Sequence, residues 1–579
     1  MVFRQDWNAS THRDLISKAI QELQFEEIVS LNVTASGYTL DLDSGVSYRF
    51  QGRFGAWGNI LIQSSTIAKY VDGEKQSGLD AVAFLKDVQS ACQIHDDLLA
   101  EYIEEARQTL MADYLLRQHQ DQESLDELLS LDFIQLEQRL TGHPKLIMNK
   151  GRLGWGIDDI NQYAPECQGR FRLRFLAVHP DICLFGIEQN LFYEEILADV
   201  LGESEFRSVL EQLTGPFSEY RLVGVHPWQW QRYIATQFMD DLCHQQIIDL
   251  GERGPIMTPQ SSIRTLSEAT GTGQYDIKVA LSILNTSCVR GIPQKYIEVG
   301  PKISTFVDSV VKNDPFLQEV RVLKEVASIA VPHDGYQDIK DASYRYKELL
   351  GCVWRESVAS KIAEDETAIP VSALLHLHKG ESYFKALVQD SGMTVTAWVK
   401  CYFEKVVLPL YHLQVRHGLG LVAHGQNTIL VLKRHCPAGL IIKDFHGDLR
   451  ASTSSPHLPE IQSLGLDQLP PEHLIHDLVT GHLASVLRYF SALCQDHLGL
   501  LESDFYQILK SRVETYHAQF GAPQQTSLSL LRPTFEKVLV NKVRFHAGYK
   551  ETGVRLKPML GTLINNPIMK QQEVLHVHL

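Results

Sequence analysis

One stretch of the chain, residues 424–447, predicts a β-hairpin with polar side chains at its open end. The turn His424-Gly-Gln-Asn427 precedes an apolar run, a short polar turn follows, and a second apolar run ends at Asp444. Two such runs around a short turn are typical of paired antiparallel strands. Pairing would bring Asn427 and Asp444 to the same end of the hairpin. An amide oxygen beside a carboxylate suits Mg²⁺, which proteins usually hold through one or two carboxylates and substrate phosphates. We therefore predict a metal and nucleotide site here.

The composition of the chain excludes several classes of protein. Its 579 residues are 44% hydrophobic and 21% charged, as in an ordinary globular protein with several domain-sized units. The formal net charge of −16 argues against a nucleic-acid-binding surface, which needs clustered basic side chains. The N-terminus lacks the apolar core of a signal peptide, and no apolar run is long enough to cross a membrane. The nine cysteines are scattered without a Cys-x-x-Cys pair, so we expect reduced thiols in the cytoplasm and no structural zinc.

Local patterns predict an α+β fold in three sections without flexible linkers. Residues 1–141 are mainly helical after a small β-rich start, residues 142–320 are β-rich, and residues 321–579 combine helices with the hairpin. We expect the three sections to pack around a common cleft. Strands are expected at 171–178, 182–187, 220–225 and 277–284, and helices at 11–30, 398–418, 472–517 and 528–548.

The hairpin has the outline of a kinase-type site, in which an Asn, strands and an Asp-Phe segment hold metal. The kinase catalytic loop also needs an aspartate a few residues before the Asn, to accept the proton of a substrate hydroxyl. Here Val422, Ala423 and His424 occupy that region, and no carboxylate is present. The site is therefore predicted to serve a reaction that deprotonates no hydroxyl, with a plain solvated turn as the alternative. The chain also lacks a Gly-x-Gly-x-x-Gly fingerprint after a strand, a P-loop and a Gly-x-Ser-x-Gly elbow.

Cations and hydroxyls are concentrated between residues 261 and 290. Lys278 lies within an apolar run, where a lysine is rarely buried without a partner. Phosphate oxygens are a natural partner, because lysine acts as a point charge and arginine binds two oxygens at once. An edge strand with Lys278 facing water is the alternative. The cluster comprises Ser261, Ser262, Arg264, Thr265, Lys278, Thr286, Ser287 and Arg290.

A third cluster surrounds a His-Pro pair where helix gives way to strand. In Thr141-Gly-His143-Pro the residue before the proline is restricted to extended conformations, which suits a fixed side-chain orientation. Lys150 and Arg152 follow and favour an anion, whereas an ordinary loop is the alternative. In the second His-Pro segment, His226-Pro-Trp-Gln, the tryptophan is interpreted as a packing anchor.

Together these clusters resemble the NRPS-independent siderophore (NIS) synthetases of the IucA/IucC, or aerobactin-synthetase, type. The resemblance rests on six short motifs in order, from residue 142 to about 450, and on Asn566-Pro567 near the C-terminus. Each motif is weak alone, and their shared order is specific. The motifs are Gly-His143-Pro with Lys150-x-Arg152-x-Gly154, His226-Pro-Trp-Gln229, Ser262-x-Arg264-Thr265, Lys278 with Thr286-Ser287 and Arg290, His424-x-Gln426-Asn427, and Asp444-Phe.

The resemblance implies a cupped hand, usually dimeric, with a thumb (1–141), β-rich fingers (142–320) and a palm (321–579) around a central ATP cleft. Such enzymes use ATP and Mg²⁺ to adenylate a carboxylate, and an amine or hydroxyl then displaces AMP. Carried over motif by motif, His424, Arg290 and Lys278 would be catalytic. ATP would contact Ser262, Arg264, Thr265, Lys278, Arg290, His424, Gln426, Asn427 and Asp444; the acid would contact His143, Lys150, Thr286 and Arg290; and the metal would contact Asn427 and Asp444.

The class that the chain most resembles, type A, uses citrate. The implied reaction joins a primary carboxylate of citrate to an amine, such as the diamine putrescine, and releases AMP and pyrophosphate. Within the family, 2-oxoglutarate or a citryl- or succinyl-amine intermediate is the alternative substrate. A kinase-like phosphotransferase and an inactive binding homologue are alternatives of other classes. Two positions depart from the family pattern: Val422 stands where Glu is common, and Leu146-Ile147 stand where a second His-Pro often follows. One acidic contact and the choice of acid are therefore not carried over.

Overall fold

The N-terminal part of the chain packs two long helices against a small antiparallel sheet. The computed structural model describes residues 4–286, 288–445, 447–548 and 559–570. Apolar residues three or four positions apart on α1, such as Leu15, Ala19 and Leu23, are buried and join the N-terminal hydrophobic core. The elements are α1 (Gln5–Phe25), α2 (Ala81–Asp87), α4 (Asp96–Gln122), α5 (Leu125–Leu129) and α6 (Phe133–Glu137), with the sheet order β1-β2-β3-β6-β7 made by Asn32–Thr34, Gly37–Asp41, Val46–Phe50, Ala68–Val71 and Glu74–Lys75.

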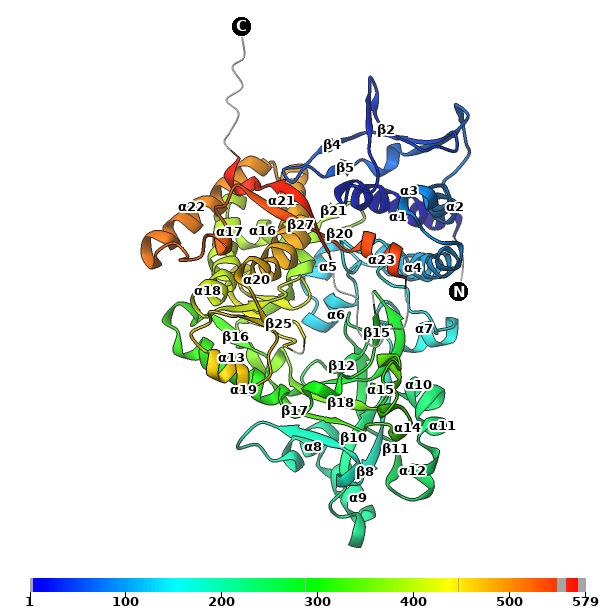
Figure 1. Ribbon diagram of the computed structural model, residues 1–579, viewed down its shortest axis with the longest axis vertical. Helices are drawn as coiled ribbons and strands as arrows, with labels where there is room; N and C mark the ends of the chain where they lie inside the picture. The colour runs from blue at the N-terminus through cyan, green and yellow to red at the C-terminus, as the bar shows by residue number, and fades with distance from the viewer. Residues whose placement is uncertain (1–3, 287, 446, 549–558, 571–579) are drawn as a thin grey trace.

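The middle of the molecule is an eight-stranded antiparallel sheet, which forms the green lower part of Figure 1. Its order is β10-β8-β11-β12-β13-β18-β17-β9, so β13 is an internal strand between β12 and β18. The expected strands at 171–178, 182–187 and 220–225 are confirmed as β8, β9 and β10, with small shifts of their ends. The strands are β8 (Phe171–Val178), β9 (Leu184–Ile187), β10 (Arg221–Val225), β11 (Ile247–Pro259), β12 (Thr265–Glu268), β13 (Tyr275–Val279), β17 (Glu325–Ala330) and β18 (Gly351–Glu356).

The single strand expected at 277–284 is wrong, because the chain leaves the sheet in the middle of this run. Ala280 still donates its backbone N–H to Gly351 of β18, but the next residues belong to β14 (Leu281–Asn285). This strand pairs with β15 (Cys288–Arg290) in a separate two-stranded sheet. One apolar run therefore serves two sheets, and the pairing of β14 with β15 sets Arg290 opposite Leu281, close to Lys278 in the chain.

The C-terminal part packs a layer of helices on a four-stranded sheet that contains the predicted hairpin. β23 (Thr428–Lys433) and β24 (Cys436–Ile442) pair antiparallel from Lys433–Cys436 to Thr428–Ile442. The expected helix 398–418 is continuous but includes a π-helical turn before Pro409, whose missing N–H disturbs the α-helical pattern. The other elements are β16 (Val320–Val322), β19 (Glu366–Pro370), β22 (Leu419–Leu421), β25 (Leu449–Ser452), α13 (Gly300–Asn313), α16 (Tyr383–Ser391), α17 (Val395–Tyr402), α18 (Leu408–Arg416), α19 (Leu458–Ser463), α20 (Pro471–Leu478), the π-helical segment η11 (Val479–Leu487), α21 (Arg488–Leu498) and α22 (Glu502–Phe520).

The helix expected over 528–548 is wrong in its first half. Residues Thr534–Leu539 form strand β27, which pairs antiparallel with β28 (Met559–Asn565), and only Asn541–Ala547 is helical (α23). Phe535 and Leu539, which fit the spacing of a helix face, are buried as strand residues instead. The pairing partner lies far enough along the chain that the local pattern does not reveal it.

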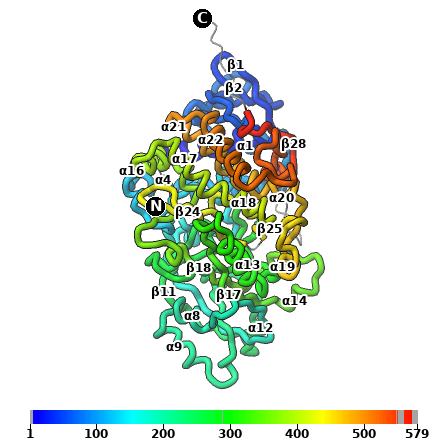
Figure 2. Tube along the Cα trace, turned by 90° about the vertical axis from the view of Figure 1, so that its left-hand side faces the viewer, coloured from blue at the N-terminus to red at the C-terminus, as the bar shows by residue number. Residues whose placement is uncertain are grey.

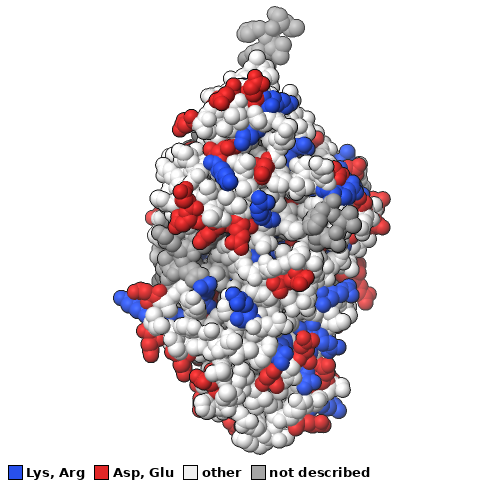
Figure 3. Space-filling model, turned by 90° about the vertical axis from the view of Figure 1, so that its right-hand side faces the viewer, with Lys and Arg blue, Asp and Glu red and all other residues white. Residues whose placement is uncertain are grey.

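The chain crosses between the middle and C-terminal cores near residue 320. α13 precedes this point and packs into the C-terminal core, whereas β17 and β18 follow it and are internal strands of the eight-stranded sheet. The α+β class is confirmed, and the division at residues 141 and 320 stays a prediction. Within the described residues no helix has the length and apolar character needed to span a membrane. Figure 3 shows acidic and basic side chains interspersed on one face of the molecule.

Candidate active site

The end of the β23–β24 hairpin brings Asn427 and Asp444 together, as the pattern of apolar runs predicts. Thr428 pairs with Ile442, and the backbone N–H of Lys443 donates to the carbonyl of Asn427 at 3.3 Å. Asp444 follows directly with a positive φ of 63°. A left-handed backbone costs a non-glycine residue energy and persists only where its surroundings hold it. At Asp444 the side chains of Lys278 and Arg355 bind the carboxylate and hold this conformation.

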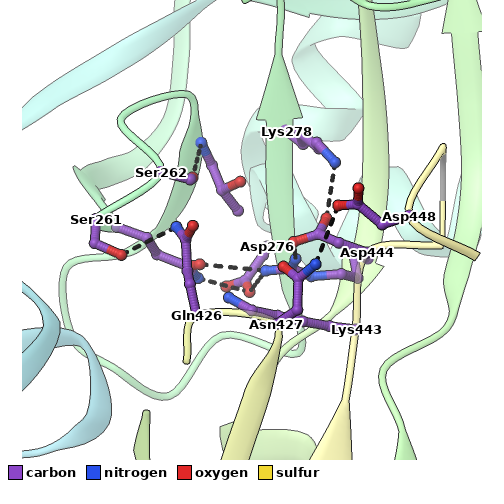
Figure 4. Close-up of polar contacts among 12 residues, drawn as sticks. Ser261, Ser262, Asp276, Lys278, Gln426, Asn427, Lys443, Asp444 and Asp448 are labelled. Atoms are coloured by element: carbon purple, nitrogen blue, oxygen red, sulfur yellow. Dashed lines mark hydrogen bonds and ion pairs between the residues drawn. The ribbon is translucent and has the colours of Figure 1, made fainter. Parts of the chain in front are cut away.

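Asp444 is the meeting point of the hairpin and the eight-stranded sheet (Figure 4). Its Oδ1 lies 2.7 Å from Nζ of Lys278 on β13, and its Oδ2 accepts from Nη1 of Arg355 on β18 at 3.2 Å. Burial alone would raise the pKa of this carboxyl, but Lys278 and Arg355 hold it well below its usual range. Asp444 is therefore ionised, and Lys278 is its counter-ion rather than a solvated lysine on an edge strand.

A buried ion network under Asp444 fixes its position. Arg355, almost fully buried, also donates to Oδ2 of Asp276 at 2.8 Å. Asp276 accepts further hydrogen bonds from Gln260 at 2.8 Å and from Ser267 at 2.6 Å. A buried charge is tolerated only when it is paired and hydrogen-bonded, and every member here is. Sequence reasoning missed Arg355 and Asp276, whose only signal is a charge inside an apolar strand.

The loop before β12 carries the predicted phosphate-binding hydroxyls beside Lys278. Thr265 pairs with Lys278 across β12 and β13, and its backbone N–H donates to Oγ of Ser262 at 3.1 Å. Gln426 of the hairpin donates to Oγ of Ser261 at 3.1 Å, which joins this loop to the end of the hairpin (Figure 4). The alternative of a water-facing Lys278 on an edge strand is wrong, because β13 is internal and the side chain is 12% exposed.

Two arginines from this part of the chain are tied to one segment. Arg264 donates to the backbone carbonyl of Gly291, the residue after Arg290. Arg290 donates from Nη2 to Oγ1 of Thr286 and from Nε to the carbonyl of Asn285 at 3.1 Å. Thr286 has a positive φ of 62°, and Ser287 lies outside the described residues. The predicted Arg264, Thr286 and Arg290 therefore belong to one connected group.

His424 and His143 face one another across the site, with ring centroids 6.1 Å apart. Nδ1 of His424 accepts from the backbone N–H of Gln426 at 3.2 Å, and Nδ1 of His143 accepts from the N–H of Lys145 at 3.2 Å. A nitrogen that accepts carries no proton, so each neutral ring has its proton on Nε2. Burial lowers the pKa of His424 and takes that of His143 well below its usual range. Both rings are thus neutral hydrogen-bond donors.

The backbone around His143 is surrounded by lysines. Lys150 lies 2.7 Å from Oδ1 of Asp113 and also donates to the carbonyl of Thr141. Lys18, on α1, donates to the carbonyl of His143 at 2.9 Å, and burial lowers its pKa to about 7. No local pattern singles out Lys18, because it lies more than a hundred residues earlier on an ordinary amphipathic helix. The arrangement favours an anion beside His143.

Two residues from the predicted motifs do not reach the site. Arg152 is buried in an ion pair with Glu166, with Nη2 and Oε2 2.6 Å apart, so the expected anion contact of Arg152 is not supported. His226 is fully buried and packs on the rings of Tyr163 and Phe171, with centroids 4.6 and 4.7 Å away. The interpretation of Trp228 as a packing anchor is confirmed, since it is buried in the middle core.

A carboxylate lies next to the position of Val422 although the residue itself offers none. Asp448 accepts from Nδ2 of Asn427 at 3.0 Å, and its backbone carbonyl accepts from the N–H of Val422 at 2.9 Å. Its charge, like that of Asp444, opposes the effect of burial on the pKa of His424. Asp448 was not predicted, because the hairpin pattern ends before it.

The loop that carries His424 rests on a π-helical segment. His482 of η11 bonds through Nδ1 to the carbonyl of Ala423 at 2.9 Å and through Nε2 to the hydroxyl of Tyr402 at 2.8 Å. A Cβ at Gly481 would stand 2.9 Å from the backbone nitrogen of Ala423, so only glycine allows this close approach. π-helical turns occur often at functional sites, and this one supports the backbone of the loop that carries His424.

Comparisons with known proteins agree with this arrangement. The IucA / IucC family model matches residues 132–376, and a model described as ferric iron reductase FhuF-like transporter matches residues 396–553. Aerobactin synthase of Vibrio mimicus is 34% identical, over 98% of this chain and 98% of its own, and that of Escherichia coli is 33% identical over 97% and 98%. The solved structure of aerobactin synthetase IucC from a hypervirulent pathotype of Klebsiella pneumoniae has a TM-score of 0.85 and 31% identity, and the match covers 98% of each chain.

The fold and these relatives define the class as the NIS synthetases. The chain belongs to the IucA/IucC family of that class, which confirms the family predicted from the six motifs.

Proposed function

We propose that this protein is an ATP-dependent ligase that adenylates a carboxylate of citrate or of a citryl amide and joins it to an amine. The observation that carries the proposal is the contact between His143 and His424. It joins the loop of His143 and Lys150 to the hairpin side, with Lys278 and Asp444. The charge of Arg290 is close enough to His424 to help lower its pKa. An acid on one side and a triphosphate on the other would meet at these two rings.

In the first step, a carboxylate oxygen of the acid attacks the α-phosphorus of ATP, and the bond to pyrophosphate breaks. Two anions approach one another, so preorganised cations lower the barrier by offsetting the repulsion. Lys278 and Arg264 are proposed to bind the phosphates with Ser262 and Thr265, and Arg290 to bridge acid and phosphate. No base is needed, because the carboxylate is already ionised, and this agrees with the absence of a kinase-type aspartate before Asn427.

The donor set at the end of the hairpin fits Mg²⁺. Asp444, Asp448 and Asn427 offer hard oxygen ligands, and the amide of Asn427 uses its nitrogen for the bonds to Asp448 and to the carbonyl of Val422. Among the described residues, nothing donates to its amide oxygen. We propose that Asn427 and Asp444 hold the metal, with Asp448 as a further ligand and Gln426 on the nucleotide. When bound, Mg²⁺ supplies charge neutralisation of the triphosphate.

In the second step, a neutral amine attacks the acyl carbon, the tetrahedral oxyanion collapses, AMP leaves, and the new amide nitrogen loses one proton. An oxyanion needs donors placed in advance. His424 presents Nε2–H, because its Nδ1 is occupied by backbone N–H groups. His143 also presents Nε2–H, and we propose that it faces the acid together with Lys150 and Thr286. We therefore assign His424 as the oxyanion donor and not as the base.

The identity of the acid is proposed from the relatives. Putrebactin synthase of a Shewanella strain is 29% identical, and a Bacillus anthracis relative named citryl-spermidine/3,4-dihydroxybenzoyl-citryl-spermidine:spermidine ligase is 30% identical. N(2)-citryl-N(6)-acetyl-N(6)-hydroxylysine synthase of Vibrio mimicus is 22% identical. The stronger likeness to a ligase whose name contains a citryl amide favours the citryl-amine alternative alongside free citrate. A diamine such as putrescine remains the proposed amine.

A cavity of about 130 Å³ beside the His143 loop offers a place for the second substrate. It lies between that loop and the segment of Ser372, whose N–H donates to the carbonyl of Gly425 next to His424. Tyr489 on its wall donates to Glu22 at 2.6 Å, and the charge of Glu22 is balanced by Arg488 at 2.8 Å. The overall charge of −16 would attract a cationic polyamine at low ionic strength.

We further propose that the protein is a homodimer in the cytoplasm and that it binds neither nucleic acid nor membrane.

Hydroxylamine trapping tests this proposal. The protein is incubated with ATP, Mg²⁺, hydroxylamine and one acid from a panel of citrate, a citryl monoamide, a succinyl monoamide and 2-oxoglutarate. Hydroxamate and AMP should form with citrate or the citryl monoamide. Formation with 2-oxoglutarate alone would overturn the choice of acid. ADP as the product nucleotide would favour the kinase-like alternative, and no nucleotide release with any acid would favour an inactive homologue.

A further inference from the structure

Outside the proposed active site, one carboxylate and two imidazoles converge on a common point. Asp314 follows the end of α13, His412 is on α18, and His417 follows the end of α18. Oδ2 of Asp314 lies 2.9 Å from Nε2 of His412 and 2.8 Å from Nε2 of His417. All three ligand atoms lie within 4.8 Å of one another, and the described residues hold this one group of at least three His, Cys, Asp or Glu with such spacing. We propose that Asp314, His412 and His417 bind a divalent transition-metal ion.

Each of the three residues has its other polar atom held by a separate partner. Oδ1 of Asp314 accepts from the backbone N–H of Phe316 at 2.8 Å. Nδ1 of His412 meets the hydroxyl of Tyr516 at 2.8 Å, and Nδ1 of His417 meets Nε2 of His457 at 3.0 Å. Metal-binding histidines and carboxylates nearly always have such outer partners, which fix the ring tautomer and orientation. The two Nε2 atoms are thereby left facing Oδ2 of Asp314.

The separations also indicate the kind of coordination. With metal–ligand bonds of about 2.1 Å, ligand atoms 2.8 to 2.9 Å apart subtend angles near ~85° at the metal. Both Asp–His angles suit neighbouring positions of an octahedron and are too narrow for a tetrahedral structural zinc site. Two His and one carboxylate are the ligand set of Fe²⁺-type sites, and imidazole also suits Co²⁺, Ni²⁺ and Zn²⁺.

The location gives the ion access and a role. His412 is buried between the rings of Phe316 and Phe520, whereas Asp314 and His417 keep 17% and 16% of their side chains exposed. His417 is followed by Gly418 and by β22, which leads directly to the His424 loop. A bound ion would tie the end of α13 to the end of α18 and, through His417, to His457 at the start of α19. In Figure 2, α13 and α18 lie near the middle of the molecule and α19 lies toward its right. The ion would stabilise the start of β22, the strand that precedes the loop of His424, the proposed oxyanion donor.

Cobalt binding tests the site without reference to ligase activity. Tag-free, full-length protein is treated with a chelator, dialysed and titrated with Co²⁺ by isothermal titration calorimetry, and the cobalt retained after gel filtration is measured. Wild-type protein should retain close to one equivalent. Asp314→Asn and His417→Gln should abolish this retention, and His457→Phe should weaken binding about tenfold to hundredfold.

Three controls separate this site from other histidines and from the proposed Mg²⁺ site. His473→Gln removes an exposed histidine elsewhere on the surface, and Asp444→Asn removes a proposed magnesium ligand; both should retain cobalt as wild type does. The double variant His576→Ala, His578→Ala removes the two histidines near the C-terminus and should also retain it. Circular dichroism of each metal-free variant verifies folding. Cobalt retention that survives Asp314→Asn in folded protein, that is lost only in the C-terminal double variant, or that is absent from wild type would overturn the proposal.

Discussion

Replacing Lys278 with methionine separates a contribution to catalysis from a contribution to folding. The side chains of Lys278 and Asp444 are 12% and 13% exposed, and their charged atoms are 2.7 Å apart. Removing one partner of a buried pair costs about 3–5 kcal/mol when the other charge is left alone. Here Arg355 remains 3.2 Å from Asp444, so Lys278→Met should lower the free energy of unfolding by only ~1–2 kcal/mol.

The catalytic effect of the same change should be larger. If Lys278 moves from Asp444 to a phosphate oxygen when ATP binds, the substitution removes one preorganised cation from the transition state. Losing one such group costs about 10²–10³ in rate, or ~3–4 kcal/mol. Initial rates of AMP release at saturating acid measure this loss, and thermal unfolding measures stability.

Two further variants make the comparison decisive. Arg355→Met leaves both Asp276 and Asp444 without their shared cation and should destabilise the fold by about 3–5 kcal/mol, more than Lys278→Met does. Lys312→Met removes a lysine that is 69% exposed and paired with Asp308 one helical turn away, and it should change neither quantity. If Lys278→Met keeps kcat/KM for ATP within threefold of wild type, the assignment of Lys278 to the phosphates is wrong.

Three other outcomes follow from the site. Burial holds the pKa of both His143 and His424 below the ordinary value of 6.5, so both rings stay neutral as pH falls to that value. The value of kcat/KM for ATP should therefore decline only at lower pH. A decline centred at pH 6.5 or above would contradict this assignment. His482→Leu leaves the hydroxyl of Tyr402 and the carbonyl of Ala423 unpaired, which should cost ~1–3 kcal/mol of stability and reduce kcat about tenfold with little change in KM, whereas a changed KM alone would exclude positioning. Asn427→Ala should raise the Mg²⁺ concentration needed for half-maximal AMP release about tenfold, and an unchanged requirement would remove Asn427 from the proposed ligands.

The features that the sequence predicted well are those whose signal is local. β8 and the β23–β24 hairpin appear as short apolar runs bounded by turns, and both form as expected. Lys278 stood out because a charge inside an apolar strand requires a partner. The partner itself, Asp444, is 166 residues away, and only the order of the motifs suggested that the two belong to one site.

The features that were missed depend on contacts distant in sequence. Arg355 and Asp276 carry no motif, and their importance follows from mutual burial beneath Asp444. Lys18 reaches the His143 loop from the first helix, and Asp448 supplies a carboxylate where Val422 offers none. Strand β27 was expected as helix because its apolar residues fit both periods and its partner β28 lies beyond the local window.

The most direct measurement of the central claim is the fate of the carboxylate oxygen. The protein is incubated with ATP, Mg²⁺, an amine and citrate or citryl monoamide labelled with ¹⁸O in its carboxylates, and the nucleotide product is analysed by mass spectrometry and ³¹P NMR. If the carboxylate attacks the α-phosphorus and the amine then attacks the acyl carbon, AMP must carry one ¹⁸O atom and pyrophosphate none. ADP as product, or AMP without the label during amide formation, would contradict the adenylation that His424, Arg290 and Lys278 are proposed to perform.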